Sequence, residues 1–312
     1  MMEQGEVVAK VFDHSDVENE VGAFGIVRLN IPKEFLIEQF RDIASFKDST
    51  AVQAIGKFST PPTLQDLDAL TLNAQDIRDL KKCEPGDCKV KMDANMMEQF
   101  QTQVDWRAPD YEEQATRLMR QILVEYVNTY LQVGDAAMGE YHDQEDPLHR
   151  ADAFQGILQN SPYLMGYVPE LYTYLLEFPY GDLSNVENFI YWSKEDFGLK
   201  PVINLFHVTM YTRERKGSTE VFITSKQIYA SHYFETALGF TAFVNEVGSE
   251  EASPDSYLMY LNRSRFDQLR GKLKGLIVAI AKNRVYDGVK KYFRQVKERL
   301  ETEQMAKIIS MQ

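Results

Sequence analysis

The chain has 312 residues, of which 44% are hydrophobic, 26% charged and 12% aromatic. This composition is typical of a folded globular protein and excludes a disordered chain. The formal net charge of −13 disfavours general nucleic-acid binding, because a phosphate backbone requires a concentrated basic surface. The most apolar runs, such as residues 276–281, are too short to cross a bilayer.

The chain begins with a strand-and-helix pattern. Residues 6–12 and 25–31 predict β-strands, and in the second of them the side chains alternate along the strand. Pro32 follows at once and suits the first turn of a helix. The next apolar residues recur at helical spacing and predict a helix directly after the strand: Phe35, Leu36, Phe40, Ile43 and Ala44.

The two cysteines, Cys83 and Cys88, lie on either side of a Pro-Gly turn. Such a turn can bring the two Cα atoms within disulfide range, so we expect a small disulfide loop, with free thiols as the alternative. A zinc site is disfavoured because a second pair of ligands is missing. A disulfide favours a periplasmic or secreted protein over a cytoplasmic one. Residues 1–5 lack the features of a signal peptide, so any export signal is expected to be absent or already removed.

The middle of the chain is mostly helical, with short turns first and a long amphipathic helix after them. We expect residues 60–185 to form a mainly helical insertion. The predicted helical segments are residues 64–67, 74–77, 111–141, 152–159 and 169–176.

The last third changes to β-branched and aromatic runs separated by turn-forming stretches, which predicts a series of antiparallel strands. These runs are residues 189–192, 201–211, 219–230, 233–244 and 256–261. An apolar stripe then predicts a C-terminal helix of about 35 to 40 residues, with Ser264 or Asp267 as its N-cap.

Basic residues are concentrated near this helix. Residues 262–299 carry a net charge of +9, so the remainder of the chain carries −22. The lysines and arginines can neutralise the acidic body of the protein or contact an anionic membrane surface peripherally. We favour neutralisation within the protein.

The order of a strand, a helix, an insertion, several antiparallel strands and a long terminal helix resembles that of helix-grip domains. On residues 25–46 and 188–300, the chain resembles the START-related superfamily of lipid-binding and polyketide-cyclase proteins. The resemblance implies an α+β fold in which an antiparallel sheet wraps the C-terminal helix. Its core would comprise residues 1–59 and 186–312.

Three segments are also similar to uncharacterised bacterial proteins that are often exported: residues 83–88, 225–234 and 257–265. That similarity implies no activity.

The helix-grip resemblance implies binding or transport of a hydrophobic, lipid-like small molecule in an apolar cavity, without a cofactor and without catalysis. The C-terminal helix would form one wall, with Gly271 and Gly275 on the side that faces the ligand. The alternatives are a cyclase- or hydrolase-type enzyme that uses the same cavity, and a scaffold protein that contacts a partner through its helical insertion. The oligomeric state stays open.

The candidate ligand-binding residues lie mainly on the predicted strands. Asn204 and His207 can orient an apolar ligand, or they are buried polar residues that hydrogen-bond within the core. Lys226 lies among apolar and aromatic residues, so it needs a partner if it is buried and is otherwise exposed. Tyr229 and His232 belong to the same aromatic segment, and we expect His232 to be structural. In the enzyme alternative, His207, His232 or Lys226 would act as acid-base groups.

Two further candidates are Arg263 and Arg265, at the junction of the last strand and the final helix. Two guanidinium groups can hold a carboxylate or phosphate, or they can pair with the protein's own carboxylates. Residues 140–149 contain several acidic and histidine side chains, but their spacing matches no metal-binding motif. We therefore predict no metal site.

Overall fold

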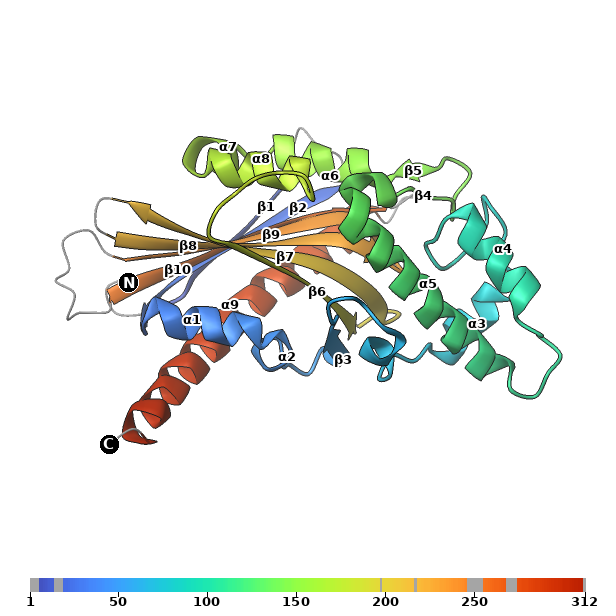
Figure 1. Ribbon diagram of the computed structural model, residues 1–312, viewed down its shortest axis with the longest axis horizontal. Coiled ribbons are helices and arrows are strands. Elements are labelled where there is room, and N and C mark those ends of the chain that lie inside the picture. The colour runs from blue at the N-terminus through green and yellow to red at the C-terminus, as the bar shows by residue number, and fades with distance from the viewer. Residues whose placement is uncertain are drawn as a thin grey trace.

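The computed structural model describes residues 6–13, 19–196, 198–215, 218–245, 255–267 and 274–310. For residues 12, 13, 218, 245, 255, 274–287 and 292 it describes the backbone and not the side chain. Within this part of the chain, eight strands form one antiparallel sheet with helices on both faces (Figure 1). The expected α+β class with a large antiparallel sheet and a C-terminal helix is confirmed.

The eight strands of the sheet are β1 (Val8–Asp13), β2 (Glu20–Asn30), β3 (Val52–Lys57), β6 (Val186–Glu195), β7 (Val202–Arg215), β8 (Ser218–Ala230), β9 (Phe234–Asn245) and β10 (Asp255–Phe266). A separate small hairpin consists of β4 (Glu140–Tyr141) and β5 (Leu148–His149).

The helices before the insertion are α1 (Lys33–Arg41) and α2 (Ile43–Phe46). Those of the insertion are η2 (Leu64–Leu67), α3 (Ala74–Leu80), α4 (Ala94–Gln103), α5 (Tyr111–Val133), η3 (Gly134–Ala137), α6 (Arg150–Gln159), α7 (Pro162–Tyr167) and α8 (Pro169–Glu177). The last helix is α9 (Lys274–Ser310).

The strand order across the sheet is β1-β2-β10-β9-β8-β7-β6-β3. From β2 the chain passes through α1 and α2 to β3 at the far edge. After the insertion, β6 to β10 run back as a meander until β10 pairs with β2. The first and last parts of the chain therefore lie side by side.

The predicted strands in the last third are all present, and most are longer than expected. Strand β3 and helices α4 and α7 were not predicted. The helix expected over residues 111–141 ends at Val133, because Gly134 takes a positive φ of 60° that stops the helix. The prediction of Ser264 as an N-cap is wrong, since Ser264 lies within β10 opposite Ala237.

Each face of the sheet packs against its own set of helices. The face that we call the α9 face lies against α1, α2 and α9, and the face that we call the insertion face lies against helices of the insertion (Figure 1). The α9 face contributes Val27, Leu29, Val208, Val221, Ile223, Phe243 and Leu258 to one apolar core. The insertion face contributes Ile190, Trp192, Leu205, Phe222, Tyr229, Leu238 and Phe240 to the other.

The insertion shares its apolar core with the sheet. Its buried residues, such as Ile122 of α5, Phe154 of α6 and Leu171 of α8, belong to the same cluster as the strands of the insertion face. Cys83 and Cys88 form the predicted disulfide, with their Cα atoms 4.5 Å apart. The loop that it closes is tied to β4, because the backbone N–H of Gly86 donates to the carbonyl of His142 over 2.8 Å.

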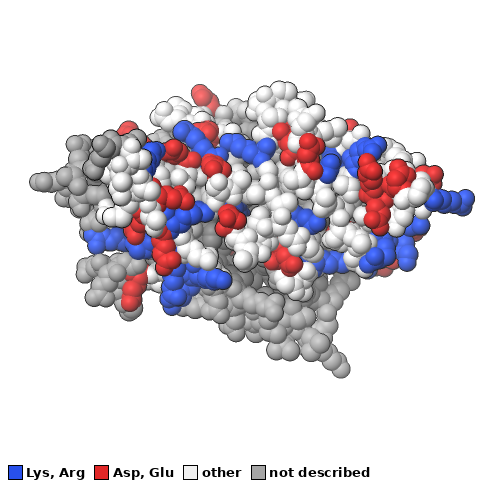
Figure 2. All heavy atoms as spheres, turned by 90° about the horizontal axis from the view of Figure 1, so that it is seen from below, with Lys and Arg blue, Asp and Glu red and all other residues white. Residues whose placement is uncertain are grey.

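Helix α9 crosses the opposite side of the sheet and reaches α1 and α2 (Figure 1). Phe293 lies so close to Gly25 of β2 that an added Cβ atom would come within 2.5 Å of the ring. Arg299 donates to the carbonyl of Phe46, and Lys307 pairs with Glu38 of α1. Seen from below, basic and acidic side chains are interspersed over the described surface (Figure 2). The ion pair of Lys297 with Glu301 neutralises part of the basic charge of the C-terminal region within the protein.

Candidate functional site

The α9 face changes character along its strands. At one end, the neighbouring residues Leu258, Phe243 and Val221 form an apolar row across β10, β9 and β8. Four residues further along β10, the corresponding row is Asn262, Gly239 and Ser225. Small and polar residues thus replace large apolar ones on the same side of the same strands.

Asn204 of β7 and Gln227 of β8 lie at this polar end. The Nε2 atom of Gln227 donates to Oδ1 of Asn204 over 2.9 Å, and both side chains are buried. The other amide atom of Gln227, Oε1, is buried and has no hydrogen-bond partner in the described part of the chain. An unsatisfied buried acceptor costs about 1–3 kcal/mol, so a donor from water, from a side chain that the structure does not describe or from a ligand would stabilise this atom.

A second polar group on the α9 face joins α2 to β6. Lys47 donates to the hydroxyl of Tyr191 over 3.2 Å and lies 3.6 Å from a carboxylate oxygen of Glu195. Ser193 donates to the same carboxylate over 2.6 Å. Burial raises the pKa of Tyr191 to about 12, so its hydroxyl stays protonated. Phe206 of β7 stacks on Tyr191, which connects this group to the strand that carries Asn204.

The structure does not test whether either of the two glycines expected to face a ligand does so. Gly271 lies outside the described residues. Gly275 lies in α9, in the stretch 274–287 whose side chains the structure does not describe.

On the insertion face, His207 is held by two hydrogen bonds. Its Nδ1 atom lies 2.9 Å from the hydroxyl of Tyr130, and its Nε2 atom lies 2.9 Å from Oδ1 of Asn188. Since the amide oxygen can only accept, this arrangement assigns the proton to Nε2 and makes Nδ1 the acceptor from Tyr130. Burial, together with the nearby charge of Lys226, lowers the pKa of His207 to about 3, so the ring is neutral at pH 7.

Lys226 lies directly opposite His207 on the neighbouring strand. Its ammonium group pairs with Asp135 of η3 and lies 3.9 Å from the ring centroid of Phe154. The side chain of Lys226 is 1% exposed and that of Asp135 is 25% exposed. Burial lowers the pKa of Lys226, while the Asp135 carboxylate acts in the opposite direction. The lysine therefore has the partner that its burial requires.

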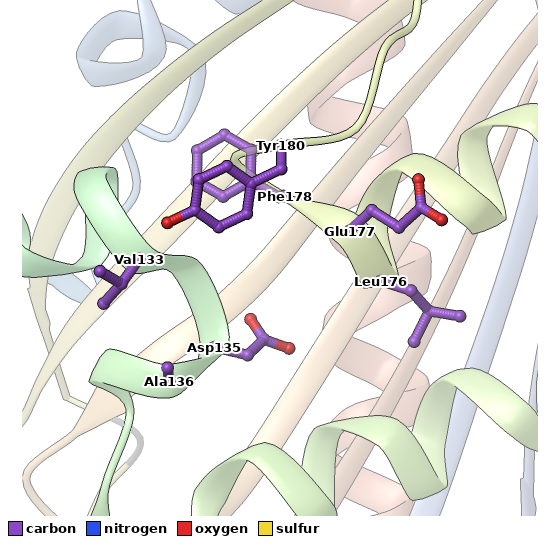
Figure 3. A pocket seen from close by; sticks show the side chains of 7 residues that line it. All are labelled: Val133, Asp135, Ala136, Leu176, Glu177, Phe178 and Tyr180. Carbon is purple, nitrogen blue, oxygen red and sulfur yellow. The ribbon is translucent and has the colours of Figure 1, made fainter.

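The group formed by His207, Lys226 and Asp135 lies beneath a hollow of about 370 Å³ in the surface of the insertion (Figure 3). Asp135 points its carboxylate into the open space, and Phe178, whose ring centroid lies 4.2 Å from that of His207, forms part of the wall. Both nitrogens of His207 are occupied and Lys226 is paired with Asp135. Acid-base chemistry at either residue would require these contacts to be broken first.

The remaining aromatic candidates bind other parts of the protein. The hydroxyl of Tyr229 donates to the carbonyl of Lys91 over 3.0 Å. The Nε2 atom of His232 lies 3.1 Å from Oδ1 of Asp76, which also lies 3.7 Å from the ammonium of Lys200. Both candidates hold the insertion against the sheet.

The two arginines also pair within the protein. Arg263 is buried and its guanidinium donates to Glu20 of β2 over 2.5 Å and to Ser161 over 3.3 Å. Arg265 pairs with Glu235 of β9 at 3.0 Å. Both arginines therefore pair with carboxylates of this chain, which is the alternative to holding the carboxylate or phosphate of a ligand.

The structure thus divides the candidates. It brings His207 and Lys226 together on the insertion face and places Asn204 on the opposite α9 face, so these three side chains do not line one cavity. Among the described residues, no group of three or more His, Cys, Asp or Glu side chains is placed to hold a metal ion. No helix within the described ranges is long and apolar enough to span a membrane.

Four important residues were not singled out from the sequence: Tyr130, Asp135, Asn188 and Gln227. Strand alternation in the sequence already predicts that Asn204 and His207 lie on opposite faces of one strand, and the structure confirms this. The contact of Lys226 with Asp135 joins positions 91 residues apart, and no local pattern indicates it.

No protein-family model matches the chain, and no curated protein matches it significantly.

Proposed function

We propose that the protein binds a lipid-like small molecule between the α9 face of the sheet and helix α9, and that it does so without covalent chemistry. The ligand would be amphiphilic, with an apolar body and a group that donates a hydrogen bond.

The connectivity supports this proposal. A strand (β2), two helices (α1 and α2), a strand at the far edge (β3), a meander (β6 to β10) and a long helix (α9) follow the order of helix-grip domains. In such domains the space between the sheet and the last helix holds the ligand. The insertion lies on the other face, so it leaves that space to α9.

The observation that carries the proposal is the open acceptor of Gln227. This side chain is 4% exposed, its amide nitrogen is used by Asn204, and its Oε1 atom has no partner in the described part of the chain. Gly239 and Ser225 lie on the same face, and the ring of Tyr260 packs on Gly239, 3.4 Å from the position of an added Cβ atom. A ligand would take the place of this ring beside Gln227. A hydroxyl or N–H of a ligand would satisfy the acceptor and set the orientation of the ligand.

Burial of the apolar body would supply the affinity, at about 25 cal/mol for each Å² of apolar surface removed from water. Apolar residues adjoin the polar end on the same face, among them Tyr260, Ile223 and Met210. The disulfide supports a periplasmic or secreted location, where such bonds persist.

Native mass spectrometry of the purified protein tests the proposal. We expect a species that carries one small molecule, which organic solvent extracts. Protein that is free of any adduct and fails to bind fatty acids or phospholipids added in excess would contradict it.

A further inference from the structure

The hollow on the insertion has mixed walls. Apolar side chains line it on several sides. Asp135 and Glu177 also belong to its lining, with the carboxylate of Asp135 directed into the open space and that of Glu177 directed outward from the rim (Figure 3). The apolar lining consists of Val133, Ala136, Leu176, Phe178 and Tyr180. Its volume of about 370 Å³ lies within the range of small-molecule sites, which is roughly 300–1,000 Å³.

Two helices end at the hollow. Helix α5 ends at Val133 and helix α8 ends at Glu177, and both of these residues line it. The C-terminus of a helix carries a partial negative charge of about half an elementary charge, because its last carbonyls have no partner within the helix. Both helix ends therefore add negative potential near the hollow, although the carbonyl of Glu177 accepts hydrogen bonds from the N–H groups of Tyr180 and Gly181.

The carboxylates add to this potential. Lys226 neutralises Asp135 from beneath, whereas no ion pair of the exposed Glu177 occurs among the described residues. The two carboxylates and the one ammonium leave a net charge of −1 at the hollow, before the helix termini are counted. An anionic ligand would be repelled, and a cation would be attracted.

The aromatic and aliphatic walls add a second requirement. Tyr180 is 78% exposed, which is unusual for a large aromatic side chain, and its hydroxyl donates to the carbonyl of Gln132 over 3.0 Å. This bond fixes the ring at the rim. Leu176 and Val133, also exposed, offer apolar surface nearby. An inorganic cation would leave this surface unused, whereas an organic cation would cover it.

The backbone holds the hollow in shape. Gly134 has a positive φ of 60°, and a Cβ atom there would collide with the carbonyl oxygen of Phe178. Only glycine lets the end of α5 approach the end of α8 so closely. The hollow is therefore built from two segments that fit each other.

We propose that this hollow binds an organic ammonium ion with an apolar body. The ammonium group would lie beside the carboxylate of Asp135, near the two helix ends, with Glu177 adding negative charge at the rim. The apolar body would cover Tyr180, Leu176 and Val133. The site lies on the face opposite to the proposed lipid-like ligand and does not depend on it.

Isothermal titration calorimetry at pH 7 with benzylammonium chloride tests this inference, with benzyl alcohol as the uncharged probe of the same shape. We expect saturable binding of benzylammonium that is at least about tenfold tighter than that of the alcohol, because only the ammonium ion is attracted by the negative charge. This ratio corresponds to about 1.4 kcal/mol. Glu177→Gln and Tyr180→Ala should each weaken benzylammonium binding by about threefold to tenfold. Glu98→Gln, an exposed glutamate of α4, is the matched control and should leave it unchanged.

Three results would overturn the inference: no saturable binding of benzylammonium, equal binding of the alcohol, or an equal loss in Glu98→Gln and Glu177→Gln. Glu177 and Tyr180 are exposed, so their variants should fold as the unsubstituted protein does, which a thermal melt checks. Gln227→Met, on the other face of the sheet, should bind benzylammonium normally.

Discussion

Gln227 donates a hydrogen bond to Asn204 across neighbouring strands of the α9 face, while its own acceptor oxygen is buried and has no hydrogen-bond partner among the described residues. The pair lies where the side chains of this face become small and polar. Most buried side-chain polar atoms in folded proteins have a hydrogen-bond partner. This relationship is the basis of the proposed ligand site.

His207 should make the protein less stable in acid. Its folded-state pKa of about 3 lies below the unfolded value near 6.5, so the unfolded state takes up a proton that the folded state excludes. Stability is therefore full above about pH 6.5 and falls by up to about 1.4 kcal/mol for each pH unit below it. Urea denaturation of the unsubstituted protein and His207→Gln between pH 7 and 4.5 measures this. The variant should show a smaller slope than the unsubstituted protein, and equal slopes in the two proteins would contradict the assignment.

The ion pair of Lys226 and Asp135 should respond asymmetrically to substitution. Asp135→Ala leaves a fully buried ammonium without a counter-charge and should cost about 3–5 kcal/mol. Lys226→Met leaves a partly exposed carboxylate that water can hydrate, and its side chain still packs on Phe154, so it should cost less. Chemical denaturation gives both values. The double variant should be more stable than Asp135→Ala alone, and a larger loss for Lys226→Met would contradict this account.

Gly134 should not tolerate a side chain. Alanine there must adopt a positive φ and meet the carbonyl of Phe178, so Gly134→Ala should destabilise the protein by about 2 kcal/mol or more. Gly166 of α7 is the control, since no atom lies within 4 Å of its added Cβ and alanine favours helices. Thermal melts should separate the two variants clearly. Equal melting temperatures would show that the α5 end can move away from Phe178.

The disulfide should contribute about 2 kcal/mol, the loop-closure value for a short ring. Reductant should lower the urea midpoint of the unsubstituted protein and leave the Cys83→Ser/Cys88→Ser double variant unchanged. Titration of thiols in denaturant provides a direct check. Two free thiols in protein made under oxidising conditions would contradict the bond.

The sequence predicts the elements well where a local pattern determines them. The strands β6 to β10 carry long β-branched and aromatic runs, and α9 carries an apolar stripe, so both were found. Strand β3 was missed because it is a short edge strand that pairs with β6 alone. Helix α4 could have been found from Asp93, which caps it, and from Met96, Met97 and Phe100 on one side.

The site was less predictable, because the partners of its residues come from distant segments. Alternation predicts which face of the sheet a strand residue lies on only as far as the next β-bulge. Such a bulge shifts the register of β7 and β8 between Leu205 and Phe206. Tyr130 and Asn188 reach His207 from a helix and a neighbouring strand. No spacing in the sequence indicates such a meeting.

The most direct test of the proposed function compares ligand occupancy in three proteins by native mass spectrometry: the unsubstituted chain, Gln227→Met and Thr224→Val. Thr224 is the matched control, because its buried hydroxyl also has no partner among the described residues but lies on the insertion face. We predict that Gln227→Met lowers occupancy by a lipid-like molecule about tenfold, the value of one good hydrogen bond, while Thr224→Val retains it. Equal occupancy in all three proteins, or no bound molecule in any of them after incubation with lipids, would contradict a ligand site on the α9 face.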